Sequence, residues 1–234
     1  MTHRVVKRAA ALVMGLCLAA CVTTGQYILA PDAKGLVIDT ATGQPIAGAE
    51  VRYVALEGIS PVRTDVDGRF TLDGRVERRT ALVLPVSGVY RDATRVQVSV
   101  PGLPYGYATV GFINGIRSGP PVEPRPAIYP VIVLMFPADA PETPLHSLMQ
   151  DCVAGPEQQH ALQMVAYLAG LDAAEPPDWL TPDTAEGLQE HLGRALPSSG
   201  FMECARMSEA WAMFRRDTAV LWTVRASRQA SEAR

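Results

Sequence analysis

The stretch that decides the fold reads Gly35-Leu-Val-Ile-Asp-Thr-Ala-Thr-Gly-Gln-Pro-Ile-Ala-Gly-Ala-Glu-Val51, and Thr64-Asp-Val-Asp-Gly-Arg-Phe-Thr-Leu72 follows it. Gly43 and Gly68 suit the positive φ of tight turns, and Pro45 fixes φ just after the first turn. Around these turns apolar residues occupy every second position, at Ala49, Val51, Tyr53, Phe70 and Leu72. Because successive side chains of a strand point to opposite faces, this pattern predicts short strands with one buried face.

Further strands are predicted along the chain as far as residue 136. They lie at about 34–39, 49–56, 64–72 (a hairpin through Asp67-Gly68), 80–86, 94–100, 107–113 and 128–136. Strands at this density, separated by Gly, Pro and Asp turns, favour a β-sandwich over a parallel α/β sheet.

This order of turns and strands resembles the carboxypeptidase regulatory-like domain over roughly residues 33–136. The likeness is carried by the turn Thr42-Gly-Gln-Pro45, the strand start Gly48-Ala-Glu-Val51 and the turn Asp65-Val-Asp-Gly68. It implies a seven-stranded Greek-key sandwich at residues 33–140, related in fold to transthyretin. It also implies an accessory module, because the family has no common active site.

Residues 1–20 are predicted to be a bacterial export signal. Arg4, Lys7 and Arg8 form its positive start, and the apolar part that follows is shorter than the roughly 20 residues of a membrane span. It ends Leu18-Ala-Ala-Cys21, which looks like a lipobox. The resemblance implies that Cys21 carries diacylglycerol, becomes the first residue after cleavage, and is acylated again with a palmitate-type chain. The alternative is an ordinary secretory signal followed by a coincidental cysteine.

In the lipoprotein interpretation, residues 21–32 are the lipidated cysteine and a tether that holds the domain off the membrane. Val22 follows the cysteine where an Asp would favour retention, so the sorting habit of lipoproteins predicts the bacterial outer membrane. We expect the domain to face the periplasm.

Net charge argues against a nucleic-acid partner. The whole chain has a formal charge of −3, and residues 21–234 hold 18 basic and 24 acidic residues, a net −6. A basic face of the kind that binds phosphates is therefore not expected. Lys7 and Lys34 are the only lysines.

Residues 141–234 are predicted to be an α-helical region. Apolar residues at helical spacing indicate helices at about 157–171, 181–196 and 203–227, the second capped by Thr181 before Pro182. The last helix carries an apolar stripe of Met207, Trp211, Phe214, Thr218, Leu221 and Trp222. Core packing is the simpler use of this stripe, and a membrane-surface helix is the alternative.

Cys152 and Cys204 are the two cysteines left in the exported part, apart from Cys21. In an oxidising compartment such a pair predicts one disulfide. They are too few and too far from histidines in sequence to suggest a zinc site.

Two strands of the predicted sandwich are apolar on both faces. Leu36 and Ile38 lie opposite Val37, and residues 131–136 read Val-Ile-Val-Leu-Met-Phe without a polar face. A strand covered on both sides is continuously apolar, whereas a strand facing water alternates. We therefore expect the helical region to pack on the outside of one sheet.

An enzyme is not predicted, and no cofactor or metal is expected. Residues 31–140 contain no histidine and no cysteine, and His146, His160 and His191 are spaced without a His-Glu-x-x-His pattern. His160 is expected to be a solvated residue on the polar side of its helix. The aspartates of Asp65-Val-Asp67 lack the further oxygen ligands of a calcium loop, so a turn is the expected structure.

Two loops are candidates for binding. The segment Gly102-Leu-Pro-Tyr-Gly-Tyr107 presents Tyr105 and Tyr107, which could stack on a sugar or peptide or instead fold back on the core. Residues 118–130 hold five prolines and are expected to be extended, either as a peptide-docking arm or as a stiff connection.

Two functions remain. The first is an outer-membrane lipoprotein whose non-catalytic sandwich and helices form a structural or protein-interaction module for an envelope partner. The second is a carbohydrate- or peptide-binding module that uses the Tyr105/Tyr107 loop. An enzyme with its site among the helices is a distant third.

Overall fold

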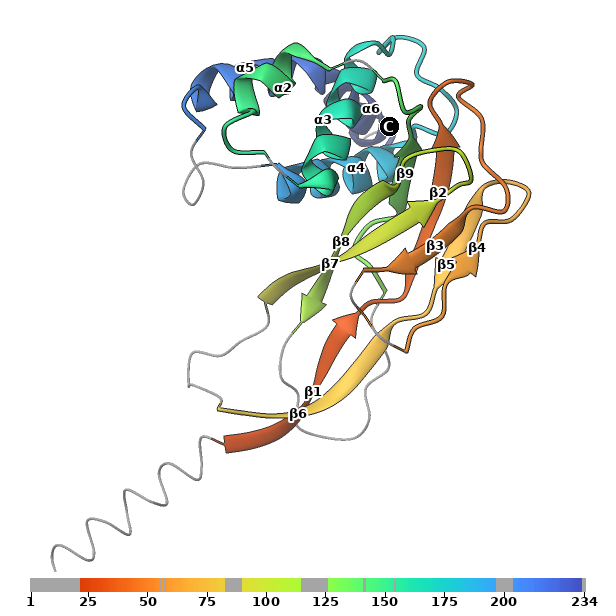
Figure 1. The fold of residues 1–234 in the computed structure, drawn as a ribbon, viewed down its shortest axis with the longest axis vertical. Coiled ribbons are helices and arrows are strands. Elements are labelled where there is room, and N and C mark those ends of the chain that lie inside the picture. The colour runs from red at the N-terminus through yellow and green to blue at the C-terminus, as the bar shows by residue number, and fades with distance from the viewer. Residues whose placement is uncertain are drawn as a thin grey trace, which may run out of the picture.

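The computed structural model describes residues 22–54, 56, 58–82, 90–114, 126–140, 142–153, 155–196 and 204–232. Within them the fold is mixed α+β, with strands first and helices after them (Figure 1). The strands are β1 (Val22–Ala30), β2 (Ala33–Asp39), β3 (Glu50–Tyr53), β4 (Val62–Arg63), β5 (Arg69–Leu72), β6 (Arg75–Leu82), β7 (Tyr90–Ser99), β8 (Gly106–Asn114) and β9 (Val131–Met135). The helices are α2 (Pro144–Met149), α3 (Pro156–Ala169), α4 (Pro182–Ala195), α5 (Met207–Asp217) and α6 (Ala219–Glu232).

The nine strands form three sheets. Their orders are β1-β6, β5-β2-β9 and β4-β3-β7-β8, and all pairs are antiparallel except β2 with β9. The second and third sheets face each other across a core that includes Val37, Phe70 and Val133 on one side and Val51 and Val98 on the other. A seven-stranded Greek-key sandwich is not confirmed, but strands packed in facing layers are.

A second core lies on the other side of the β5-β2-β9 sheet. It joins side chains of β2 and β9 to the helices: Leu36, Ile38, Ile132, Leu134 and Phe136 pack with residues of α2, α3, α4 and α6. Figure 1 shows these helices gathered at one end of the strands. The prediction from the doubly apolar strands is thus confirmed: the helical region covers the outside of one sheet.

The tether predicted at residues 21–32 is largely a strand. β1 runs from Val22 to Ala30 and pairs with β6, so that Val22 lies opposite Leu82 and Tyr27 opposite Glu77. The ribbon extends away from the helices (Figure 1). The strand was not predicted from the sequence, because the strand that pairs with it, β6, lies about 50 residues later in the chain and satisfies its backbone groups there. The expected signal at 1–20 and Cys21 lie outside the described residues.

The single helix predicted at 203–227 is two helices, α5 and α6. The helix is interrupted at Thr218, the C-cap of α5, which is buried and whose hydroxyl donates to the Phe214 carbonyl at 2.7 Å. Beyond this point Leu221 and Val224 face the core, whereas Trp222 is 57% exposed. The expectation that Trp222 is buried was therefore wrong, because α6 turns Leu221 and Val224 to the core and successive side chains of a helix point about 100° apart.

A disulfide joins Cys152 and Cys204, as the sequence predicts. The two Cα atoms are 5.2 Å apart and the residues are 52 positions apart in sequence. Cys152 follows α2 and Cys204 precedes α5, so the bridge closes a loop that holds α3 and α4.

Candidate functional site

A groove lies where the β5-β2-β9 sheet meets the start of α4. We call it the junction groove. Its volume is about 600 Å³, within the range of ligand-binding pockets. Lys34, Leu36, Arg69, Thr71 and Ile132 line it from the sheet, and Asp178, Trp179, Thr181 and Thr184 line it from the helical side.

The sheet places charged and apolar side chains in the groove by its period of two. Lys34 and Leu36 of β2 lie opposite Thr71 and Arg69 of β5 in the register, so all four share the outer face of the sheet. Val37 on the other face belongs to the core between the sheets. The groove thus has a polar part over β5 and an apolar part where Leu36 meets Ile132.

Trp179 forms the opposite wall. Its ring stacks on Tyr167 of α3, with centroids 6.5 Å apart and planes at 23°, which fixes its orientation. Thr181 and Thr184 next to it cap α4 reciprocally: each backbone N–H donates to the other's hydroxyl. The threonine hydroxyls and two amides at this helix start are therefore already occupied.

Three cationic side chains reach the groove from the sheets, namely Lys34, Arg63 and Arg69. Arg63 donates one hydrogen bond to the Gly48 carbonyl at 2.9 Å, and none of the three is ion-paired with a residue that the structure describes. Asp65 is near, but its carboxylate already accepts from the amides of Asp67 and Arg69 at 3.0 and 2.8 Å. This bonding confirms the predicted Asp-x-Asp-Gly turn.

The groove holds carboxylates and hydroxyls, but no imidazole or thiol among its described residues. Among the described residues that line it there is no serine, cysteine or histidine, and the hydroxyls of Thr181 and Thr184 are in the cap of α4. Thr71 and the carboxylates of Asp65 and Asp178 also line the groove. The arrangement can bind a ligand through charge and apolar contact.

The histidines serve a different purpose at the edge of the β4-β3-β7-β8 sheet. β8 is a terminal strand of that sheet, and the amides of Tyr107 and Thr109 donate to Nδ1 of His160 and His191 at 3.4 and 2.7 Å. His160 in turn donates from Nε2 to the Leu134 carbonyl at 2.7 Å. Imidazoles from α3 and α4 thus satisfy edge amides that would otherwise be buried without partners.

Both imidazoles are neutral in this arrangement, because a protonated Nδ1 cannot accept. Burial lowers the pKa of His160 to about 4, opposed by its hydrogen bond to the Leu134 carbonyl. Burial also lowers the pKa of His191 to about 3, and His160 lowers it further by charge repulsion. The expectation that His160 is solvated was wrong, since it is only 5% exposed.

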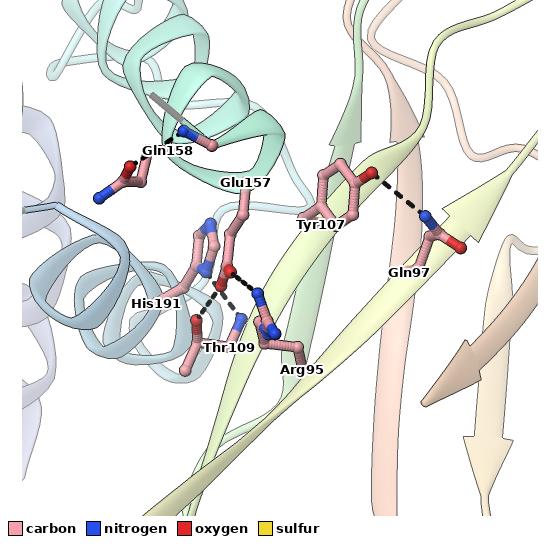
Figure 2. A network of polar contacts seen from close by, with 8 residues as sticks. Arg95, Gln97, Tyr107, Thr109, Glu157, Gln158 and His191 are labelled. Carbon is pink, nitrogen blue, oxygen red and sulfur yellow. Dashed lines mark hydrogen bonds and ion pairs between the residues drawn. The ribbon is translucent and has the colours of Figure 1, made fainter. Parts of the chain in front are cut away.

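Charged residues bridge the same sheet edge to α3 (Figure 2). The Glu157 carboxylate accepts from Thr109 Oγ1 at 2.9 Å and from Arg95 Nη1 at 3.0 Å. Because His191 accepts from the backbone amide of Thr109, this residue is held by both helices α3 and α4. This network fixes the helical layer relative to the sheets.

Tyr105 and Tyr107 do not form one stacking surface. Tyr105 is 54% exposed beside a hollow of only about 90 Å³, too small for a sugar ring, with Glu50, Arg52, Gln97 and Ser99 around it. The Tyr107 hydroxyl accepts from Gln97 Nε2 at 3.1 Å, and its ring meets His160 edge-on at 6.0 Å. Most of the proline-rich segment at 118–130 lies outside the described residues.

One group of possible metal ligands is already engaged. Ligand atoms of Asp151, Cys152 and Cys204 lie within 4.8 Å of one another. Both sulfurs are in the disulfide, however, and Asp151 accepts from the Ala205 amide at 2.7 Å. The group is structural.

The comparisons leave the family resemblance as a prediction. No protein-family model matches the chain, and no curated protein matches it. Among the described helices, none is both long enough and apolar enough to cross a bilayer.

Sequence reasoning missed the junction groove, because its walls come from segments more than 100 residues apart. Asp65 was singled out for its turn, while Trp179 and Arg69 carried no local signal of their own. Lys34 did carry a faint signal, since it is one of only two lysines in the chain.

Proposed function

We propose that the protein is a non-catalytic, lipid-anchored envelope protein whose junction groove receives an extended segment of a partner protein. The observation that carries this proposal is the groove itself: about 600 Å³, with an apolar wall, cationic side chains and no serine, cysteine or histidine among its described residues. β5, which forms one wall, is the terminal strand of its sheet, and extended peptides commonly bind along such edges.

The position of the histidines supports a binding role over a catalytic one. His160 and His191 are the buried groups best suited to general acid–base work, but each holds an amide of β8 and is kept neutral by burial. A group that fixes the helical layer is not available to a substrate.

A photo-cross-linking amino acid placed at Thr71 tests the docking role in living cells. Thr71 lies in the groove and is exposed, so we expect a discrete adduct with one envelope protein, identified by mass spectrometry and reproduced with the purified pair. The same amino acid at Arg91, exposed on β7 and outside the groove lining, is the matched control. Equal adducts from both positions, or none from Thr71, would contradict the proposal.

Anchoring is tested at Cys21. We expect the N-terminal peptide of the protein from membranes to begin at Cys21 with three acyl chains, since two or more chains are needed for stable binding to a bilayer. Mass spectrometry of that peptide and fractionation of the outer membrane are the measurements. A free Cys21 thiol, or protein released in soluble form from the unmodified gene, would rule out the anchor.

A further inference from the structure

We infer that the segment received by the junction groove is acidic, with one or more carboxylates beside an apolar side chain. This inference rests on the proposed docking function and specifies its ligand. The carboxylates meet Lys34 and Arg69 over β5, and the apolar side chain lies between Leu36 and Trp179.

The cations of the groove lack the ion pairs that several other described arginines of this protein have. Elsewhere the arginines commonly have acidic partners: six described ones, at positions 75, 95, 194, 206, 216 and 225, are in ion pairs. Lys34 and Arg69 have no such partner among the described residues, although residues 21–234 are acidic overall. Their charges are thus available to a carboxylate that arrives from outside.

The acids of the groove do not cancel these charges. Asp65 accepts the amides of Asp67 and Arg69 on Oδ1, and no ion pair joins it to Lys34, Arg63 or Arg69 among the described residues. The three cations of the lining outnumber its two carboxylates. Asp178 lies on the opposite wall beside Trp179. A carboxylate over β5 therefore meets cations, whereas one near Asp178 is repelled, which orients the segment.

Anion preference comes here from side chains and not from the start of α4. The reciprocal cap of Thr181 and Thr184 already uses the amides at that end. The apolar part of the groove selects for an apolar side chain, because its walls, Leu36 and Ile132, belong to the core beneath the helices and offer no polar group. A purely charged polymer such as nucleic acid would leave this part unfilled and would be repelled by the net negative chain.

Selection from a random octapeptide library displayed on phage tests the inference with the full-length protein. The comparison variant is Thr71→Tyr, which places a ring in the groove from an exposed strand position and suits a strand. Peptides that bind the wild type but not Thr71→Tyr are groove-dependent. We expect them to be enriched in Asp and Glu next to Leu, Phe or Trp.

Charge removal then separates the inference from the function on which it rests. In Lys34→Gln/Arg69→Gln we expect selected acidic peptides to bind about tenfold more weakly, and Arg91→Gln, outside the groove, to bind them unchanged. Groove-dependent peptides without acidic enrichment would overturn the inference and leave the docking function standing. No groove-dependent peptides at all would overturn both.

Lys34 offers a direct reporter of the contact. In Lys7→Arg protein it is the only lysine, so reductive methylation with ¹³C-formaldehyde labels one side chain besides the N-terminal amine. We expect a selected acidic peptide to shift this methyl resonance, and its variant with Asp and Glu replaced by Asn and Gln to shift it less. Binding that leaves the Lys34 signal unmoved would contradict the assigned site.

Discussion

His160 and His191 accept hydrogen bonds from the edge of β8 only while they are neutral. Their pKa values in the folded protein, about 4 and about 3, lie below the ordinary value of 6.5. As the pH falls below 6.5, these two histidines therefore bind protons in the unfolded chain but not in the folded protein. Stability due to these histidines is complete above pH 6.5 and is lost progressively as the pH falls toward their folded values.

We predict that the free energy of unfolding falls between pH 7 and pH 5 by up to about 1.4 kcal/mol per pH unit for each histidine. Urea unfolding at pH 7, 6 and 5 measures it. His191→Asn keeps an acceptor near the position of Nδ1 but cannot titrate, so its slope with pH should be smaller. His146→Gln, on α2 and away from β8, is the control and should keep the wild-type slope; equal slopes in all three proteins would contradict the role.

At this scale the sequence could predict the turns but not the histidine contacts. Gly68 has a φ of 70° and Asp65 holds its turn, as the Asp-x-Asp-Gly pattern indicated. His160 looked solvated because its helix was judged alone, whereas the contact that buries it comes from a strand 53 residues earlier. A local sequence pattern is thus enough to predict a turn, whereas the burial and protonation of a side chain depend on residues distant in sequence.

In α6, two neighbouring apolar residues lie in different environments. Leu221 is fully buried in the core shared with β2 and β9, and its neighbour Trp222 is 57% exposed with Arg225 over its ring at 5.4 Å. Neighbouring residues of one helix therefore differ entirely in their environment. The apolar stripe in the sequence includes both residues, but neighbouring side chains of an α-helix point about 100° apart, so only one of the two faces the core directly.

We predict that Leu221→Ala costs about 2–5 kcal/mol of unfolding free energy, from lost apolar contact and a residual cavity. Trp222→Ala removes a larger side chain but should cost under about 1 kcal/mol, mostly its contact with Arg225. Chemical denaturation of both variants gives the comparison. A greater loss for Trp222→Ala would mean that the phase of α6 is wrong.

The disulfide ties the start of α5 to the end of α2. Since it closes a loop of 52 residues, the chain-entropy model gives it about 4 kcal/mol. We predict that Cys152→Ser/Cys204→Ser lowers the melting temperature, and that neither cysteine of wild-type protein from the periplasm reacts with an alkylating reagent under denaturing, non-reducing conditions. Labelling of both would show that the pair is not formed in the cell.

For the whole molecule, we expect the helical layer and the sheets to fold and unfold as one unit, because they share a core. Ending the chain after Pro141 would expose Leu36, Ile38, Ile132, Leu134 and Phe136, at about 1.5–3 kcal/mol for each large side chain, and would leave the β8 amides without their imidazoles. We predict that the shortened protein aggregates or unfolds, as followed by size-exclusion chromatography and circular dichroism beside the full chain. A soluble, monomeric and equally stable product would contradict the single shared core.

The sequence predicted this layered organisation, because a strand that is apolar on both faces must be covered on both. Leu36 is covered by the helices, and Val37 is covered by the facing sheet. It did not predict the β1–β6 ribbon or the junction groove. Both depend on how segments distant in sequence are oriented relative to one another, and the spacing of apolar residues along the chain does not predict that orientation. Facing layers could therefore be predicted, while the site between them could not.

The length of the β1–β6 ribbon would determine how far the body of the protein lies from the proposed anchor at Cys21. Nine residues of extended strand span about 30 Å, whereas a flexible linker of the same length would average roughly 17 Å between its ends and reorient freely. The base of β1 is fixed to the body by Tyr27 on Asp92 and Ile28 on Asn114. With Cys21 in the bilayer as proposed, such a stalk would hold the groove in a thin layer parallel to the membrane, and a partner segment displayed at that level would meet it at a raised effective concentration.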